Sequence, residues 1–206
     1  TMTREDDAAA CATGECLDAV FLPRLRQVAG TMTGDTVIVL HQIGSHGPSY
    51  WLRYPEGEEA FRPACHQEDL TGCSAEEIVN AYDNTIRATD RFLSDVIDLL
   101  KGQDRVAGAM YYVSDHGESL GENGLYLHGT PMFMAPDYQY KVPMVVWMSG
   151  DFRQGMGLAP DCLTGRQDRP VSHDELYSTV LGMMDIRTET RDPALDLMSG
   201  CEATPS

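Results

Sequence analysis

The chain has 206 residues, enough for one domain with a sizeable core, and carries a formal net charge of −17. It contains no basic stripe, so its charge argues against nucleic acid as a partner. No apolar run approaches the roughly 18 to 20 residues that span a bilayer, and no signal peptide opens the sequence. We therefore expect any membrane anchor to lie outside this sequence.

The six cysteines are spaced in a way typical of disulfides. Two close pairs each flank a short loop, and two cysteines remain, one in a loop and one in the tail. Thiol-ligated zinc is the alternative, but neither close pair has CxxC spacing and no third and fourth ligand lies nearby. Disulfides indicate an oxidising compartment, periplasmic or extracellular. The expected bridges are Cys11–Cys16, Cys65–Cys73 and Cys162–Cys201.

The first half of the chain predicts a helix followed by a strand. Apolar residues at helical spacing favour a helix from Cys16 to Val28, with Gly30 as its stop. Residues 35–43 are nearly continuously apolar and β-branched, which predicts a buried central strand. A long aromatic and proline-containing excursion follows at residues 49–71, and long ordered loops often cover functional sites.

The second half predicts two helices and two strands. Ser74 and Glu77 form a capping-box pattern that opens the longest helix, which ends near Gly102, and Ser172 is the expected N-cap of the last helix. The remaining elements are predicted at residues 107–113, 141–148 and 172–184. Strands that alternate with helices imply a mostly parallel sheet covered on both faces. We therefore expect an α/β/α sandwich, present here as a partial domain.

A candidate metal site follows the strand predicted at residues 107–113. Asp115 and His116 come where the strand ends, and Gly117 allows a sharp turn beneath a bound ion. A carboxylate and a neutral imidazole suit Zn²⁺. An ordinary turn, in which Asp115 bonds nearby amides, is the alternative.

Further histidines favour the metal site. His41 and His46 end the other apolar run, and His128 lies in the glycine-rich loop 121–129. Catalytic zinc keeps three protein ligands and one open position, so His46, His128 or an outside segment must supply a ligand. His46 or His128 can instead bind a phosphate oxygen or protonate a leaving group. The residues alone predict metal-dependent transfer or hydrolysis at an oxyanion, while His173 is expected to open a helix.

Three strings carry a family resemblance, namely His41 to Pro48, Asn80 to Asn84, and Ser114 to Gly124 with His128 shortly after. They resemble the lipid A phosphoethanolamine transferases, which include the mobile colistin-resistance enzymes. This family belongs to the alkaline phosphatase and sulfatase superfamily. The resemblance covers about residues 11 to 186 and implies the same α/β/α fold.

The resemblance also implies roles for four residues. Asp115 and His116 would bind Zn²⁺, and His46 and His128 would face the phosphoethanolamine group or a second zinc. The implied reaction transfers phosphoethanolamine from phosphatidylethanolamine to a lipid A phosphate at the periplasmic face of the bacterial inner membrane. The added amine lowers the negative charge that polymyxins such as colistin need, which gives resistance.

One departure from the family lies at the N-terminus. The family's nucleophilic threonine and a metal-binding glutamate precede the part matched here. Thr1, Thr3 and Thr13 lie in the wrong context, before and between cysteines, so none is expected to be the nucleophile. We expect residues 1–206 to be the C-terminal part of a periplasmic catalytic domain. The membrane helices and the first part of that domain are expected outside the sequence.

Two other functions remain open at this point. The chain is also compatible with another phosphotransferase, a phosphatase or a sulfatase of the superfamily. The string from His41 to Pro48 favours the phosphoethanolamine class. The second alternative is a non-catalytic fragment that binds a metal or a lipid headgroup.

Overall fold

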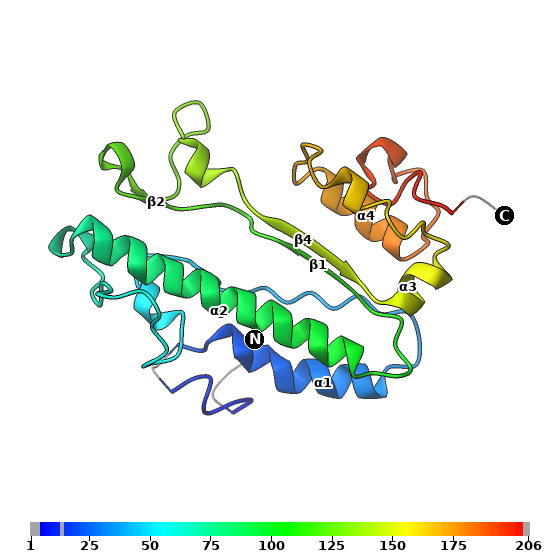
Figure 1. Cartoon of the computed structure of the whole chain (residues 1–206), viewed down its shortest axis with the longest axis horizontal. Coiled ribbons are helices and arrows are strands. Elements are labelled where there is room, and N and C mark those ends of the chain that lie inside the picture. The colour runs from blue at the N-terminus through cyan, green and yellow to red at the C-terminus, as the bar shows by residue number, and fades with distance from the viewer. Residues whose placement is uncertain (1–4, 13–14, 204–206) are drawn as a thin grey trace. The chain divides into compact units, whose positions relative to one another are not determined.

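The computed structural model describes residues 5–12 and 15–203 (Figure 1). Thr1, Thr3 and Thr13, which were not expected to be nucleophiles, lie outside the described residues. The chain divides into two compact units, one of residues 1–103 and 112–144 and one of residues 104–111 and 145–206. The helices are α1 (Phe21–Thr31), α2 (Ala75–Lys101), α3 (Gly150–Gly155) and α4 (Glu175–Met183). The strands are β1 (Ala109–Val113), β2 (Ser119–Leu120), β3 (Tyr126–Leu127) and β4 (Met144–Met148).

The longest helix, α2, begins at the predicted capping box. Ser74 Oγ accepts from the amide of Glu77 at 3.3 Å, and Glu77 Oε2 accepts from the amide of Ser74 at 2.7 Å. Helix α1 packs against α2, where the rings of Phe21 and Phe92 lie 6.3 Å apart. None of the helices in the described part of the chain is both long and apolar enough to cross a membrane.

The core of the first unit packs on the start of α2. Tyr50, Ile78 and Ala81 are almost completely buried there, with the Cys65–Cys73 disulfide beside them. The long excursion of residues 49–71 is therefore fastened to α2 rather than loose. A second cluster surrounds the Cys11–Cys16 disulfide, and Cys162–Cys201 closes the second unit, so all three expected bridges are present.

The prediction of a strand at residues 35–43 is wrong. The segment is extended, but no strand pair in residues 5–12 and 15–203 includes it. Its side chains are exposed, with Val39 84% and Val37 55% accessible. A β-branched sequence favours extended backbone, but a strand also needs a neighbour to accept its amides. The described residues supply no such neighbour for this segment.

The strands that form pair in antiparallel fashion. The amide of Ser114 donates to Pro143 O at 3.4 Å, and the amide of Ser149 donates to Gly108 O at 2.9 Å. Residue numbers thus rise along β1 as they fall along its partner β4, and β2 also pairs with β3 antiparallel. The β1–β4 pair is therefore antiparallel, whereas the sequence predicts a sheet that is mostly parallel. No long helix connects these two strands, and a parallel pair needs such a crossover.

The second unit is built around α4 and the chain that follows it. The buried hydroxyl of Thr179 accepts from the amide of Leu197 at 3.0 Å, and the buried Asp196 forms an ion pair with Arg191. Helix α4 starts at Glu175, whose carboxylate accepts from Ser172 N at 2.8 Å. Ser172 is therefore not the N-cap, a correction that follows from a turn inserted before the helix. Helix α3 was not predicted.

We predict that Ser74→Ala lowers the free energy of unfolding by about 1 kcal/mol, since it removes the side-chain cap of α2. The measurement is urea denaturation. Ser94→Ala, at an exposed position within the same helix, is the matched control and should be neutral or slightly stabilising. Equal effects of the two variants would contradict the capping role.

We also predict a pH dependence from Glu77. Its hydrogen bonds from Ser74 hold the pKa of the Glu77 carboxyl below its ordinary value of 4.5. A lowered folded-state pKa stabilises the fold above 4.5, and this contribution disappears as pH falls through the folded-state value. The stability difference between wild type and Glu77→Ala should shrink over that window. Glu76→Ala controls for loss of charge in the same turn. If Glu76→Ala and Glu77→Ala gave the same dependence of stability on pH, the role of the Glu77–Ser74 contact would be disproved.

Candidate functional site

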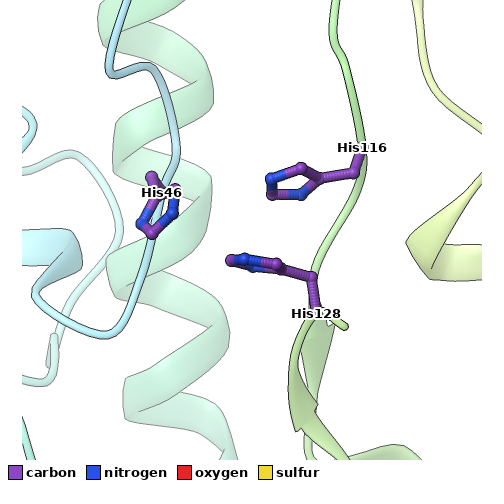
Figure 2. A group of neighbouring side chains, drawn as sticks. All are labelled: His46, His116 and His128. Carbon is purple, nitrogen blue, oxygen red and sulfur yellow. The ribbon is translucent and has the colours of Figure 1, made fainter. Parts of the chain in front are cut away.

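Three histidines from separate segments of the first unit come together (Figure 2). His46 lies in the loop before the 3-10 helix Tyr50–Leu52, His116 follows β1, and His128 follows β3. One nitrogen of each ring lies within 4.8 Å of the others. The ring centroids of His116 and His128 are 3.9 Å apart, and those of His46 and His128 are 4.9 Å apart. The three side chains, each predicted as a site residue, therefore lie together in the structure.

The hydrogen bonds of the three rings leave the same nitrogen available on each. His46 Nδ1 lies 2.7 Å from Gly47 O, and His116 Nδ1 lies 3.1 Å from Gly117 O. A carbonyl oxygen only accepts, so both Nδ1 atoms carry the proton. His128 Nδ1 lies 3.1 Å from Glu118 Oε1, an acceptor when ionised. In the neutral rings, each Nε2 therefore offers a lone pair.

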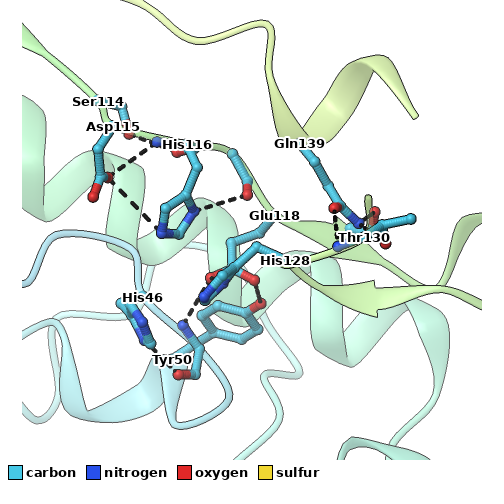
Figure 3. A network of polar contacts seen from close by, with 12 residues as sticks. His46, Tyr50, Ser114, Asp115, His116, Glu118, His128, Thr130 and Gln139 are labelled. Atoms are coloured by element: carbon cyan, nitrogen blue, oxygen red, sulfur yellow. Dashed lines mark hydrogen bonds and ion pairs between the residues drawn. The ribbon is translucent and has the colours of Figure 1, made fainter. Parts of the chain in front are cut away.

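Glu118 joins the two segments that carry His46 and His128 (Figure 3). Besides His128, its buried carboxylate accepts from the amide of Gly47 at 3.2 Å and from the hydroxyl of Tyr50 at 3.4 Å. Burial, and then the charge of Glu118, raise the pKa of Tyr50, so this hydroxyl stays protonated and donates. The carboxylate thus fixes a ring on one segment and the backbone next to a ring on the other.

The turn after His116 admits only glycine. A Cβ on Gly117 would lie 2.0 Å from Tyr138 O, and the amide of Gly117 donates to Gln139 O at 3.0 Å. The buried Gln139 side chain donates to Ser119 at 2.9 Å and to Thr130 at 3.2 Å. These contacts tie the segment after His128 to the segment after His116.

The residue before His128 has an unusual backbone. Leu127 has φ of +62°, a left-handed conformation that costs a branched side chain roughly 1 to 3 kcal/mol. Packing on the Tyr50 cluster compensates for that cost, because Leu127 contacts the buried core of the first unit. Strain held by packing is typical of functional sites, and here it lies directly before His128.

Asp115 lies at the edge of the cluster. Its Oδ1 accepts from the amide of His116 at 3.0 Å and lies 3.9 Å from His116 Nε2. Its side chain is 82% exposed, and it is not part of the three-histidine group found among the described residues. His41 and His173 also lie outside that group. The predicted role of Asp115 as a zinc ligand stays a prediction.

The cluster suits a cation or an oxyanion, depending on its protonation. Neutral rings present lone pairs, and ligating histidines in metalloproteins usually donate their other nitrogen to a carbonyl or carboxylate, as all three do here. The donor set therefore fits Zn²⁺. Protonated rings would instead present N–H donors to a phosphate or sulfate oxygen.

Sequence reasoning missed two residues of this network, Glu118 and Tyr50. Both lie in or beside the strings already singled out, but their roles depend on long-range contacts, with Glu118 and Tyr50 68 positions apart. An acidic residue that follows His116 so closely was the available signal. The pattern alone could not distinguish a ligand from a partner of a ligand.

Comparisons with known proteins show the family to which this chain is similar. Residues 2–186 match the family model described as Sulfatase. Phosphoethanolamine transferase EptA of Escherichia coli (strain K12) is 43% identical over 193 residues, which are 93% of this chain and 35% of that protein. Phosphatidylethanolamine transferase Mcr-2 of Escherichia coli is 40% identical over 174 residues, with coverage of 84% and 31%. The chain thus spans about a third of the length of these curated relatives.

A solved structure is similar over nearly the whole chain. The soluble domain of lipooligosaccharide phosphoethanolamine transferase A from Neisseria meningitidis has a TM-score of 0.93 and 41% identity. The match covers 99% of this chain and 62% of that one. It confirms the expected alkaline phosphatase/sulfatase-like α/β fold as a partial domain.

We predict that Glu118→Ala weakens zinc binding by about 10- to 100-fold, because His128 loses the acceptor that orients it. The measurement is a competition titration against a zinc chelator. Glu122→Ala is the matched control, since Glu122 accepts from the amide of Leu120 at 2.7 Å in the same hairpin. Equal zinc affinities for the two variants would rule out this role of Glu118.

Proposed function

Since the chain belongs to the sulfatase family, we propose that it forms part of a phosphoethanolamine transferase that modifies lipid A. The convergence of His46, His116 and His128 is the observation that supports it most directly. Relatives at 40% and 43% identity carry phosphatidylethanolamine and phosphoethanolamine transferase names. Transfer of a phosphoryl-linked group needs positive charge placed around phosphate oxygens, which the cluster and a bound cation would supply.

We assign the metal role to Zn²⁺, with Asp115 and His116 as ligands. Bound zinc would supply a Lewis acid that stabilises charge on a phosphate oxygen. His46 and His128 bind the phosphoethanolamine group or a second zinc. Their Nδ1 atoms are hydrogen-bonded to protein acceptors, which leaves Nε2 to hold a phosphate oxygen or give a proton to the departing oxygen. We propose none of the residues described in this site as the nucleophile.

We propose phosphatidylethanolamine as donor and a lipid A phosphate as acceptor. The site would then work at the periplasmic face of the bacterial inner membrane, with a membrane domain and the first part of the catalytic domain outside this sequence. The three disulfides fit an oxidising compartment. The consequence for the cell is colistin and polymyxin resistance, because an added amine reduces the negative charge of lipid A.

The test uses the complete parent protein in polymyxin-sensitive bacteria. Mass spectrometry of lipid A should show phosphoethanolamine with the wild type and none with His116→Ala, which loses a ligand. His128→Ala should slow transfer about 10²- to 10⁴-fold, the usual effect of removing a proton-transfer group. His66→Ala is the control, since His66 is exposed and pairs with Glu59.

Three outcomes separate the candidate functions. Unmodified lipid A with the wild type, together with hydrolysis of a phosphate or sulfate ester, would favour a phosphatase or sulfatase. Zinc binding without turnover would favour a non-catalytic fragment. Full activity of His116→Ala with unchanged zinc content would refute the metal assignment.

A further inference from the structure

The turn that carries His46 is held by side chains from other segments. Within it the amide of His46 donates to Ile43 O at 3.2 Å, and Gly44 has φ of +55°, which favours glycine. The preceding residues 36–40 take part in no strand pair in the described part of the chain. Contacts other than a strand ladder must therefore fix the position of this turn.

Asp18 supplies the first of these contacts. It opens the 3-10 helix Asp18–Val20 that leads into α1. Its Oδ1 accepts from the amide of Ile43 at 2.9 Å, and its Oδ2 accepts from the amide of Gly44 at 3.0 Å. Each carboxylate oxygen thus holds one of two successive amides of the turn, and hydrogen bonds to an ionised acceptor are the strong kind.

Arg53 holds the other end of the same turn. Its Nε donates to His46 O at 3.0 Å, while its Nη1 forms an ion pair with Glu15. The Arg53 side chain is only 6% exposed. Asp18 and Arg53 also line a cavity of about 310 Å³. Asp18 and Arg53 thus hold the turn by hydrogen bonds to the backbone at Ile43, Gly44 and His46.

We propose that Asp18 is a positioning residue for His46. It touches neither the imidazole nor the other two site rings, and it acts through the backbone amides of Ile43 and Gly44. A displacement of about 1 Å at a reacting group can cost roughly 100-fold in rate. The inference rests on the proposed function for its catalytic consequence, while the positioning itself can be tested without catalysis.

The experiment compares four variants of the chain with its disulfides formed. Asp18→Ala removes both acceptors, and Asp18→Asn keeps one acceptor oxygen, so its effect should be smaller. Asp7→Ala is the matched control, because Asp7 accepts from the amides of Ala9 and Ala10 at 3.0 and 3.1 Å in a turn without a site residue. His46→Ala shows what loss of the ring itself does.

The readouts are the imidazole ¹⁵N NMR signals of His46, zinc affinity by competition, and the urea midpoint. Asp18→Ala should shift or broaden the His46 signals and weaken zinc binding about tenfold, and Asp7→Ala should change neither. Asp18→Ala and Asp7→Ala should both lower the urea concentration at the unfolding midpoint. A loss of stability alone therefore does not show that a residue positions His46. Where Asp18→Ala fails to fold, Asp18→Asn gives the same comparison at smaller amplitude.

The outcomes distinguish two failures. Unchanged His46 signals in the folded Asp18 variants would overturn the positioning role. Unchanged zinc affinity in His46→Ala would instead overturn the second-zinc role of His46 and leave it with the phosphoethanolamine group, while a shifted ring signal in Asp18→Ala would still support positioning.

Discussion

The buried carboxylate of Glu118 is the interaction on which the site depends. It accepts from the backbone beside His46, from the ring of His128 and from the hydroxyl of Tyr50, so it joins residues up to 71 positions apart. Three hydrogen-bond donors offset the cost of removing a carboxylate from water. Loss of one donor leaves part of that desolvation cost uncompensated and so destabilises the fold. Glu118 therefore holds the ring of His128 and the backbone next to His46 through one buried network.

Much of the fold could be predicted from local pattern. Helix α2 could be predicted from the capping box of Ser74 and Glu77 and from its apolar stripe, because helix start signals act over a few residues. The segment 35–43 shows the limit, since its composition favours extended backbone but the partner of a strand is not encoded locally. The direction in which β1 and β4 pair was hidden for the same reason.

The sequence predicted the histidines of the site but not the hydrogen bonds that hold them in place. His46 and His116 stood out because they follow apolar runs, and His128 because it lies in the nearby glycine-rich loop 121–129. The roles of Glu118, Tyr50 and Asp18 depend on contacts across 10 to 71 positions, which no spacing rule reports. Gly117 was predicted for a sharp turn, and the structure adds the nearer reason that the backbone of Tyr138 occupies its side-chain space.

The exposed apolar segment at residues 36–40 has a consequence for handling the protein. An extended β-branched run with accessible backbone is a template for pairing with another copy, so it favours association in solution. The net charge of −17 opposes that association by mutual repulsion between molecules. Because dissolved salt screens such repulsion beyond about 10 Å at 0.1 M, the colloidal stability of this chain should be greatest in dilute buffer.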